Sequence, residues 1–201
     1  GCASGRYLAG EAITLTANPA VGHHLDYWSG TNNALSNQLT MPDQDRTVTA
    51  YYLVNATPGS YDNTSPQLRY SGTWATYSGS GPTNNTLHYS SVVGSTARFW
   101  FTGKRVKVVY YAHPLYGNMS VQIDSQPAVA VSQYAASGQW QRVWTSGVLA
   151  DGDHSVVITH SSGSYISLDG FVVIDPVCRV LTLQYVGNGS APTAVPTNSA
   201  G

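Results

Sequence analysis

Charged residues are scarce in this sequence of 201 residues. Asp, Glu, Lys and Arg make up 9% of it, whereas they account for about a quarter of an average soluble domain, and the formal net charge is −1. Nucleic-acid binding relies on clustered Lys and Arg that neutralise phosphates, so we expect no nucleic-acid partner. A net charge so close to zero also leaves little electrostatic repulsion between copies of the chain.

Long apolar runs and catalytic motifs are also missing. No apolar stretch approaches the roughly 20 residues of a membrane-spanning helix, and we therefore expect no membrane insertion. The sequence has no Gly-x-Ser-x-Gly elbow, no His-Glu-x-x-His and no phosphate loop. Glycoside hydrolysis needs two facing carboxylates, and no cleft motif surrounds the single Glu or any of the Asp residues. We therefore expect no enzymatic activity and no catalytic residues.

Cysteine is limited to Cys2 and Cys178, near the two ends of the sequence. Neither belongs to a Cys-x-x-Cys pair or another metal-ligand spacing, and in an oxidising compartment a disulfide between them is the simple expectation. The sequence opens without a signal peptide, which indicates a processed product or a fragment. Five Asn-x-Ser/Thr sequons are compatible with glycosylation at the surface of a secreted protein: Asn55, Asn63, Asn84, Asn118 and Asn188.

Apolar and polar residues alternate in almost every hydrophobic segment, which is the period of a β-strand. Examples are residues 46–54, 97–101, 106–111 and 166–174, and turn signals such as Asn-Pro, Ser-Gly-Pro and Asp-Gly separate the segments. No segment predicts a helix of about ten residues or more. Because 42% of the residues are apolar and can fill a core, we expect an all-β protein built on a β-sandwich.

Two composition changes divide the sequence. The stretch NATPGS at residues 55–60 predicts a linker between an N-terminal part, residues 1–54, and a larger block, residues 61–175. A second boundary follows Asp175 and leaves residues 176–201. The end of this last segment, APTAVPTNSAG, would by itself predict a Pro/Ser/Thr-rich linker.

The N-terminal part contains four motifs in a distinctive order: GEAITLTA at residues 10–17, WSG at 28–30, TMP at 40–42 and TVTA at 47–50. On these motifs, residues 5–53 resemble the divergent internalin-type B-repeat of bacterial surface proteins. Such a repeat normally begins with a strand similar to LTLQYVGNGS, and here that stretch lies at residues 181–190, after Cys178. The resemblance therefore implies a small β-rich domain that is split across the two ends and completed by the C-terminal strand.

Three arrangements would reunite the split repeat. The chain is one period of a tandem array, or a subunit whose C-terminal strand completes the repeat of its neighbour, or a closed monomer in which residues 178–201 fold back on residues 2–54. The first two are heterologous, head-to-tail contacts that do not close, and such contacts generate filaments. A Cys2–Cys178 bridge within the rejoined repeat would contribute about 3 kcal/mol to its stability. A fourth reading makes the last segment a plain linker.

The middle block resembles the jelly-roll domains that are appended to secreted glycosidases and surface proteins. The resemblance depends on YSGTW at residues 70–74, FWFTG at 99–103, GDH at 152–154 and LDGF at 168–171. Domains of this kind often bind carbohydrate and sometimes hold a structural calcium ion. The candidate sugar-binding side chains are Trp74, Tyr77, His88, Tyr89 and Trp140, together with Tyr116, Tyr134 and one of Tyr110 and Tyr111.

Asp62 and Asp169 are the candidate calcium ligands, because a jelly roll would bring its first and last strands together and backbone carbonyls could supply further oxygen ligands. The alternative is that Asp62 caps a turn and Asp169 makes a local hydrogen bond. No other cofactor is expected.

These features together predict a secreted protein of the bacterial cell surface. Our leading interpretation is a structural or adhesive repeat unit that binds copies of itself head-to-tail through the split B-repeat. The alternative is a carbohydrate-binding accessory module of a secreted glycosidase or adhesin. The exposed aromatic side chains fit either interpretation, since they bind glycans and also dominate protein interfaces.

Overall fold

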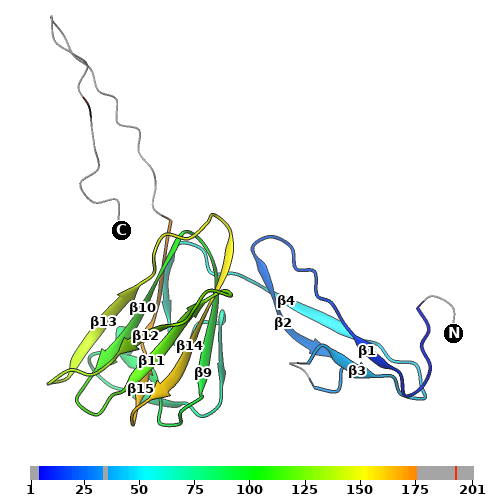
Figure 1. Ribbon diagram of the computed structural model, residues 1–201, viewed down its shortest axis with the longest axis horizontal. Helices are drawn as coiled ribbons and strands as arrows, with labels where there is room; N and C mark the ends of the chain where they lie inside the picture. Colours follow the sequence, from blue (N-terminus) through cyan, green and yellow to red (C-terminus); the bar gives the residue numbers. More distant parts are fainter. Residues whose placement is uncertain (1–4, 34–35, 176–192, 194–201) are drawn as a thin grey trace, which may run out of the picture.

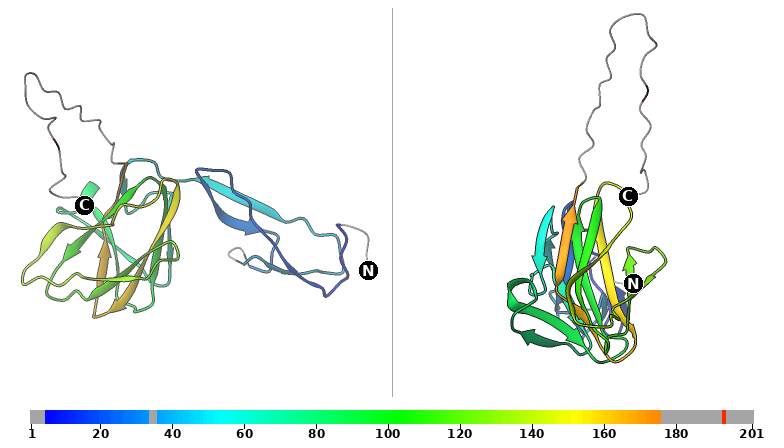
Figure 2. Two further views of the ribbon diagram at one scale, coloured as in Figure 1. Left: turned by 45° about the horizontal axis from the view of Figure 1, so that its top comes forward. Right: turned by 90° about the vertical axis from the view of Figure 1, so that its left-hand side faces the viewer.

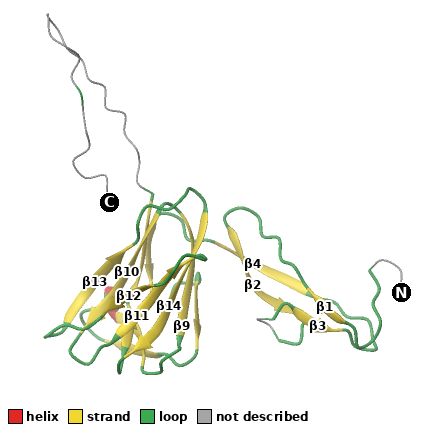
Figure 3. Cartoon of the chain, in the orientation of Figure 1, coloured by secondary structure: helices red, strands yellow, loops and turns green. Residues whose placement is uncertain are grey.

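The computed structural model describes residues 5–33, 36–175 and 193, and within them the protein is all-β (Figure 3). The expectation of an all-β protein is confirmed. A single turn of 3-10 helix, Thr83–Asn85, is the one helical element in this part of the chain. No helix in the described ranges is long and apolar enough to cross a membrane.

The N-terminal part is built from four strands in two antiparallel pairs. The pairs are β1 (Ala12–Thr14) with β3 (Gln38–Thr40), and β2 (His23–Ser29) with β4 (Thr49–Val54). They extend as a narrow arm from one side of the sandwich (Figure 1; Figure 2, left). The buried apolar side chains of this arm, among the residues described, are Trp28 and Leu39, each 7% exposed.

Two packed antiparallel sheets form the larger, C-terminal part, a β-sandwich of jelly-roll type. One sheet has the order β12-β11-β14-β9-β6. The other sheet has the order β13-β10-β16-β5 and continues as β15-β8-β7. The two groups of strands are continuous because only Asp169 separates β15 from β16, and the N–H of Asp169 donates to the carbonyl of Val109 on β10. The bounds of the first sheet are β6 (Leu68–Ser71), β9 (Thr96–Thr102), β11 (Asn118–Ile123), β12 (Val129–Ser132) and β14 (Asp153–Ser162). Those of the second are β5 (Gly59–Asp62), β7 (Ala75–Ser78), β8 (Thr86–Ser90), β10 (Arg105–Ala112), β13 (Gln139–Thr145), β15 (Ile166–Leu168) and β16 (Gly170–Ile174).

The core lies between the two sheets and follows the strand period. On β9, Ala97, Phe99 and Phe101 are fully buried, and the ring of Phe99 stacks on Phe171 of β16 with centroids 4.4 Å apart. Successive side chains of a strand point to opposite faces. The intervening residues of β9, among them Arg98 and Trp100, therefore lie on the outer surface of the sandwich.

The arm is fastened to the sandwich by ring stacking and by hydrogen bonds. The ring of His24 lies flat on Trp100, with centroids 4.1 Å apart, and its Nδ1 is 2.9 Å from the amide oxygen of Asn55. The N–H of Gly22 donates to a carboxylate oxygen of Asp153 at 2.7 Å. The stretch 55–60, which its composition predicts to be a linker, begins with two buried residues, and Ala56 forms a β-bridge to Phe101. The junction is therefore packed.

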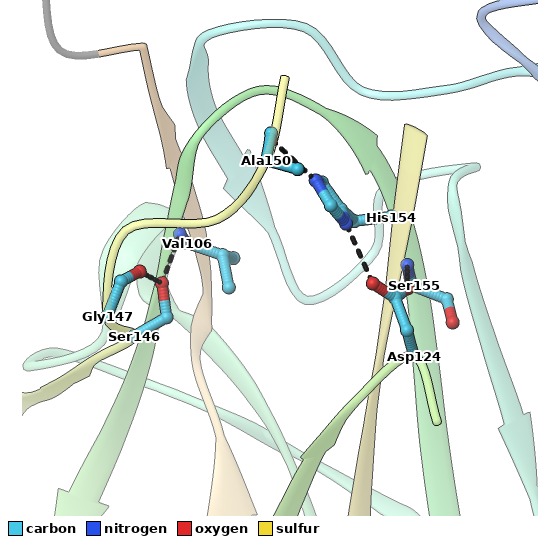
Figure 4. A network of polar contacts seen from close by, with 7 residues as sticks. All are labelled: Val106, Asp124, Ser146, Gly147, Ala150, His154 and Ser155. Atoms are coloured by element: carbon cyan, nitrogen blue, oxygen red, sulfur yellow. Dashed lines mark hydrogen bonds and ion pairs between the residues drawn. The ribbon is translucent and has the colours of Figure 1, made fainter. Parts of the chain in front are cut away.

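The end of the sandwich next to this junction is held by a polar network (Figure 4). The His154 ring lies between the carboxylate of Asp124, 2.7 Å from Nδ1, and the carbonyl of Ala150, 3.0 Å from Nε2. Nearby, the hydroxyl of Ser146 accepts a hydrogen bond from the N–H of Val106. These contacts fix the loop between β13 and β14 and keep the neighbouring Asp153 in place.

We predict that acidification weakens the protein through His24. Burial lowers the pKa of this ring. Since Nδ1 donates to Asn55, the second proton would go to Nε2, which is buried without a hydrogen-bond partner in the described part of the chain. An unfolded histidine has a pKa of about 6.5. The contribution to stability is therefore complete above that pH and is lost as the pH falls through the lower folded pKa.

Thermal unfolding at pH 7.5 and pH 5.5 measures this effect. The fall in Tm between the two values should be smaller in His24→Gln than in the parent protein, and His23→Gln serves as the control because His23 is only partly buried. Equal falls in Tm for the parent protein and His24→Gln would contradict the assignment.

Candidate functional site: an aromatic pocket

An open pocket of about 510 Å³ lies on the outer surface of the sheet that contains β10. Aromatic rings make up most of its wall, and within the described ranges no Asp, Glu, Lys or Arg lines it. The lining residues are Tyr77, Leu87, Tyr89, Tyr111, His113, Leu115, Tyr116, Trp140 and Tyr165. Its size is that of a site for a small organic ligand.

Strand alternation places one part of this wall. Tyr110 and Ala112 of β10 point into the core, at 5% and 2% exposure, so the side chain of Tyr111 between them lies on the outer surface. On β8 the residue before Tyr89 is His88, which packs inside the sandwich against Tyr70 with ring centroids 4.6 Å apart. Tyr89 is therefore on the opposite, pocket-facing side of its strand.

A β-bulge places Trp140. Tyr110 pairs with Arg142 and Ala112 pairs with Gln139, which leaves two residues of β13 opposite Tyr111. The extra residue is accommodated by a positive φ of 54° at Gln141. As a result the indole of Trp140 stacks on Tyr111 at 4.0 Å between centroids, and Tyr77 lies 5.5 Å from it.

The loop after β7 lies against Trp140, a wall residue of the pocket, and this approach depends on a glycine. A Cβ atom built at Gly81 would lie 2.3 Å from the ring of Trp140, and the φ of Gly81 is +119°, where residues with side chains are strained. Only a residue without a side chain lets this loop lie against the indole.

The polar groups of the pocket are neutral. Burial, helped by the neighbouring Tyr111, raises the pKa of Tyr116 to about 12, so its hydroxyl stays protonated near neutral pH. The N–H of Leu115 donates to Nδ1 of His113 at 3.2 Å. Nδ1 is therefore an acceptor, and the ring carries its proton on Nε2. Phenol and imidazole groups thus offer hydrogen bonds without net charge.

Three of the five predicted sugar-binding residues, Tyr77, Tyr89 and Trp140, come together here, and so does Tyr116. Trp74 lies elsewhere, partly buried against the core, with its Nε1–H donating to the carbonyls of Ser71 and Thr96. His88 is the inward-facing residue described above, and Tyr134 lies outside the lining at 62% exposure.

His113, Leu115 and Tyr165 line the pocket although the sequence did not single them out. They lie in turns, where no periodicity marks the direction of a side chain. Tyr111, by contrast, could be chosen from the core-facing pattern of its strand neighbours.

Asp62 of β5 pairs with Gly170, the first residue of β16, and Asp169 immediately precedes that strand. The carboxylate of Asp169 is 1% exposed and accepts hydrogen bonds from the backbone and hydroxyl of Thr83. Burial, and to a lesser degree Asp62, raises its pKa. Among the residues described, no three His, Cys, Asp or Glu side chains are grouped to hold a metal ion. Calcium binding stays a prediction.

The other predicted positions differ in accessibility. Asn55 and Asn63 are 3% and 0% exposed, and the Asn63 amide lies 2.6 Å from Nδ1 of His88. Asn84 and Asn118 are on the surface. Asn188 and both cysteines, Cys2 and Cys178, lie outside the described residues, as does the stretch 181–190. Glycosylation and the disulfide therefore stay predictions.

Residues 1–56 match the family described as the divergent InlB B-repeat domain. The resemblance of the N-terminal part to a B-repeat is thereby confirmed, and its completion by the C-terminal strand stays a prediction. No curated protein matches the chain.

Several solved structures are similar to this protein. A family 35 carbohydrate-binding module from Clostridium thermocellum is 11% identical, with a TM-score of 0.44, and the match covers 57% of this chain and 96% of that module. An exo-β-1,3-galactanase from Phanerochaete chrysosporium, solved with galactose, is 22% identical over 62% of this chain, with a TM-score of 0.47. A GH26-CBM35 β-(1,4)-mannanase from Podospora anserina is 16% identical over 65% of this chain, with a TM-score of 0.48. The chain spans 30% of the length of each of these two enzymes.

We predict that Gly81→Ala distorts the pocket. The new methyl group would have to push the Trp140 ring away or shift the loop, and the positive φ adds strain, for a combined loss of about 1–3 kcal/mol in the free energy of unfolding. Urea unfolding measures the loss, and near-UV circular dichroism reports the changed indole environment. Gly147→Ala is the matched control, because nothing lies within 4 Å of a Cβ atom there. Identical behaviour of the two variants would refute the role given to Gly81.

Proposed function

We propose that the protein is a non-catalytic, extracellular surface module that binds a neutral oligosaccharide in the aromatic pocket. The observation that carries this proposal is the gathering of six aromatic rings around one open pocket, with no charged side chain among the described residues that line it. The rings are those of Tyr77, Tyr89, Tyr111, Tyr116, Trp140 and Tyr165.

The chemistry of the lining fits a sugar. Pyranose rings present apolar C–H faces that pack on aromatic rings, while their hydroxyls need hydrogen-bond partners such as the phenol of Tyr116 and the imidazole of His113. An ionised ligand would lose its hydration without gaining a counter-charge from the wall. The pocket therefore favours an uncharged saccharide.

Two further features support a place at the cell surface. Residues 1–56, which include the arm, match the divergent InlB B-repeat family, and the resemblance to such repeats implies a bacterial surface protein. The low charge and high content of polar uncharged residues are also in keeping with an extracellular role.

We predict that Trp140→Ala lowers the affinity for a bound oligosaccharide at least tenfold, because loss of a stacking ring costs about 1.5 kcal/mol or more. A glycan array first identifies a ligand, and isothermal titration calorimetry then measures its affinity. Tyr134→Ala removes an exposed aromatic ring outside the pocket and should leave the affinity unchanged. Absence of any glycan ligand, or an equal loss in both variants, would reject the pocket as the sugar site.

A second function concerns the arm. In the described part of the chain, the arm consists of two separate two-stranded sheets, so each of its strands has one edge without a strand partner. Such edges accept an added strand. The stretch 181–190 resembles the opening strand of a B-repeat, and the net charge of −1 opposes association only weakly. We therefore also propose that units join head-to-tail, with the C-terminal strand of one unit completing the arm of the next and a Cys2–Cys178 bridge locking the joint.

The mass of the purified protein with and without reductant tests this joining. If separate subunits are linked, a ladder of high masses should collapse on reduction to the 21.4 kDa of a single chain. Cys178→Ser should abolish the ladder while leaving glycan binding intact. A monomer of 21.4 kDa in both conditions, with Cys2 and Cys178 bridged within one chain, would exclude this joining for the chain.

A further inference from the structure

A second cavity, of about 430 Å³, lies where the arm meets the sandwich. One wall is β2 of the arm, and the other is the outer surface of β6 and β9. These elements are on the facing sides of the two parts (Figure 1). The cavity is distinct from the aromatic pocket, with which it shares no lining residue. We call it the junction groove.

Two arginines lie side by side on the sandwich wall. Arg69 of β6 pairs directly with Arg98 of β9, and like charges in such a position repel each other. Arg69 is neutralised from the arm: its Nε–H donates to a carboxylate oxygen of Asp26 at 2.6 Å, and a second guanidinium nitrogen of Arg69 forms an ion pair with the same oxygen.

The position of Asp26 has a structural cause. Leu25 pairs with Tyr52 and Tyr27 pairs with Tyr51, so Asp26 is the extra residue of a β-bulge. A bulge turns a side chain out of the regular alternation, and here it directs the carboxylate across the groove. The exposed fraction of this side chain is 12%.

Arg98 keeps an uncompensated charge. Among the residues described it forms no ion pair, and its guanidinium lies over the ring of Trp100, 5.7 Å from the centroid. Trp100 is itself held by the stacked ring of His24. Stacking orients the planar guanidinium and leaves its edge N–H groups available for the two oxygens of an anion. Within the groove, the two arginines and Asp26 leave one net positive charge.

The rest of the groove suits a sugar. The ring of Tyr27 is 38% exposed and is supported from behind by Tyr51, with centroids 4.4 Å apart. Ser71 and Thr96, which carry hydroxyl groups, also line the groove. This combination offers an aromatic face for a pyranose ring, hydroxyl partners, and a cation for an acidic substituent.

We propose that the junction groove is a second saccharide site, selective for a sugar that carries a carboxylate or a sulfate. Arg98 binds the anionic group, and Tyr27 packs on the sugar ring. The site requires the arm and the sandwich together, since each supplies one wall. It shares with the proposed function only the class of ligand, because the junction groove and the aromatic pocket have no lining residue in common.

Binding to the intact chain tests the proposal, by isothermal titration calorimetry at 0.15 M salt. The probes are a galacturonic acid trisaccharide, a sulfated disaccharide, and a neutral galactose trisaccharide. Arg98→Gln should weaken binding of the anionic probe about tenfold or more, as expected for a lost charge-assisted hydrogen bond. Arg98→Lys keeps the charge but not the planar fork and should show a smaller loss. Arg142→Gln, an exposed arginine on β13, is the matched control and should match the parent protein.

Each outcome either supports or overturns the proposed second saccharide site. Binding of either anionic probe with the expected dependence on Arg98 supports the site and identifies the carboxylate or the sulfate as its target. Failure of both anionic probes to bind overturns it, and so do equal losses in Arg98→Gln and Arg142→Gln, which would indicate unspecific attraction. Trp140→Ala separates the two proposals, because it should weaken neutral binding in the aromatic pocket at least tenfold and leave anionic binding unchanged.

Discussion

The stacking of Phe99 on Phe171 joins the two sheets of the sandwich, and both binding surfaces depend on the orientation that it imposes. Phe99 belongs to β9, so its burial turns Arg98 and Trp100 to the outside of that strand. Phe171 is paired with Val108 of β10, and the burial of both sets the alternation that turns Tyr111 outward. Because strand side chains alternate strictly, a shift of register by one residue would bury the arginine and expose the core.

The arm supplies one wall of the junction groove. Its own core is small, and its position depends on polar and aromatic contacts: His24 on Trp100, Gly22 to Asp153, and Asp26 to Arg69. Each of these contacts engages the outer surface of the sandwich. The junction groove lies beside these contacts. In it the charge of Arg69 is balanced by Asp26, whereas among the residues described Arg98 forms no ion pair.

The two cavities differ in charge, and this difference is the basis for assigning them different ligands. The aromatic pocket has a neutral lining of rings and hydroxyls, while the junction groove contains two arginines and one aspartate. Desolvation of an ion without a partner is costly, so the first surface favours an uncharged sugar and the second an anionic one. A surface protein with both could hold a glycan of mixed charge at two points.

The class of fold, the position of most strands and the family of the N-terminal part could be predicted from the sequence, because these depend on alternation and on local motifs such as WSG and TMP. The sequence also identified four of the six rings in the pocket, those of Tyr77, Tyr89, Tyr116 and Trp140. Only the tertiary structure could separate Trp140 from Trp74, or Tyr89 from His88, since a bulge and the choice of strand face decide which ring is exposed. The groove could not be predicted from the sequence for a related reason. Asp26 and Arg69 are 43 positions apart, and their contact depends on how the arm packs on the sandwich.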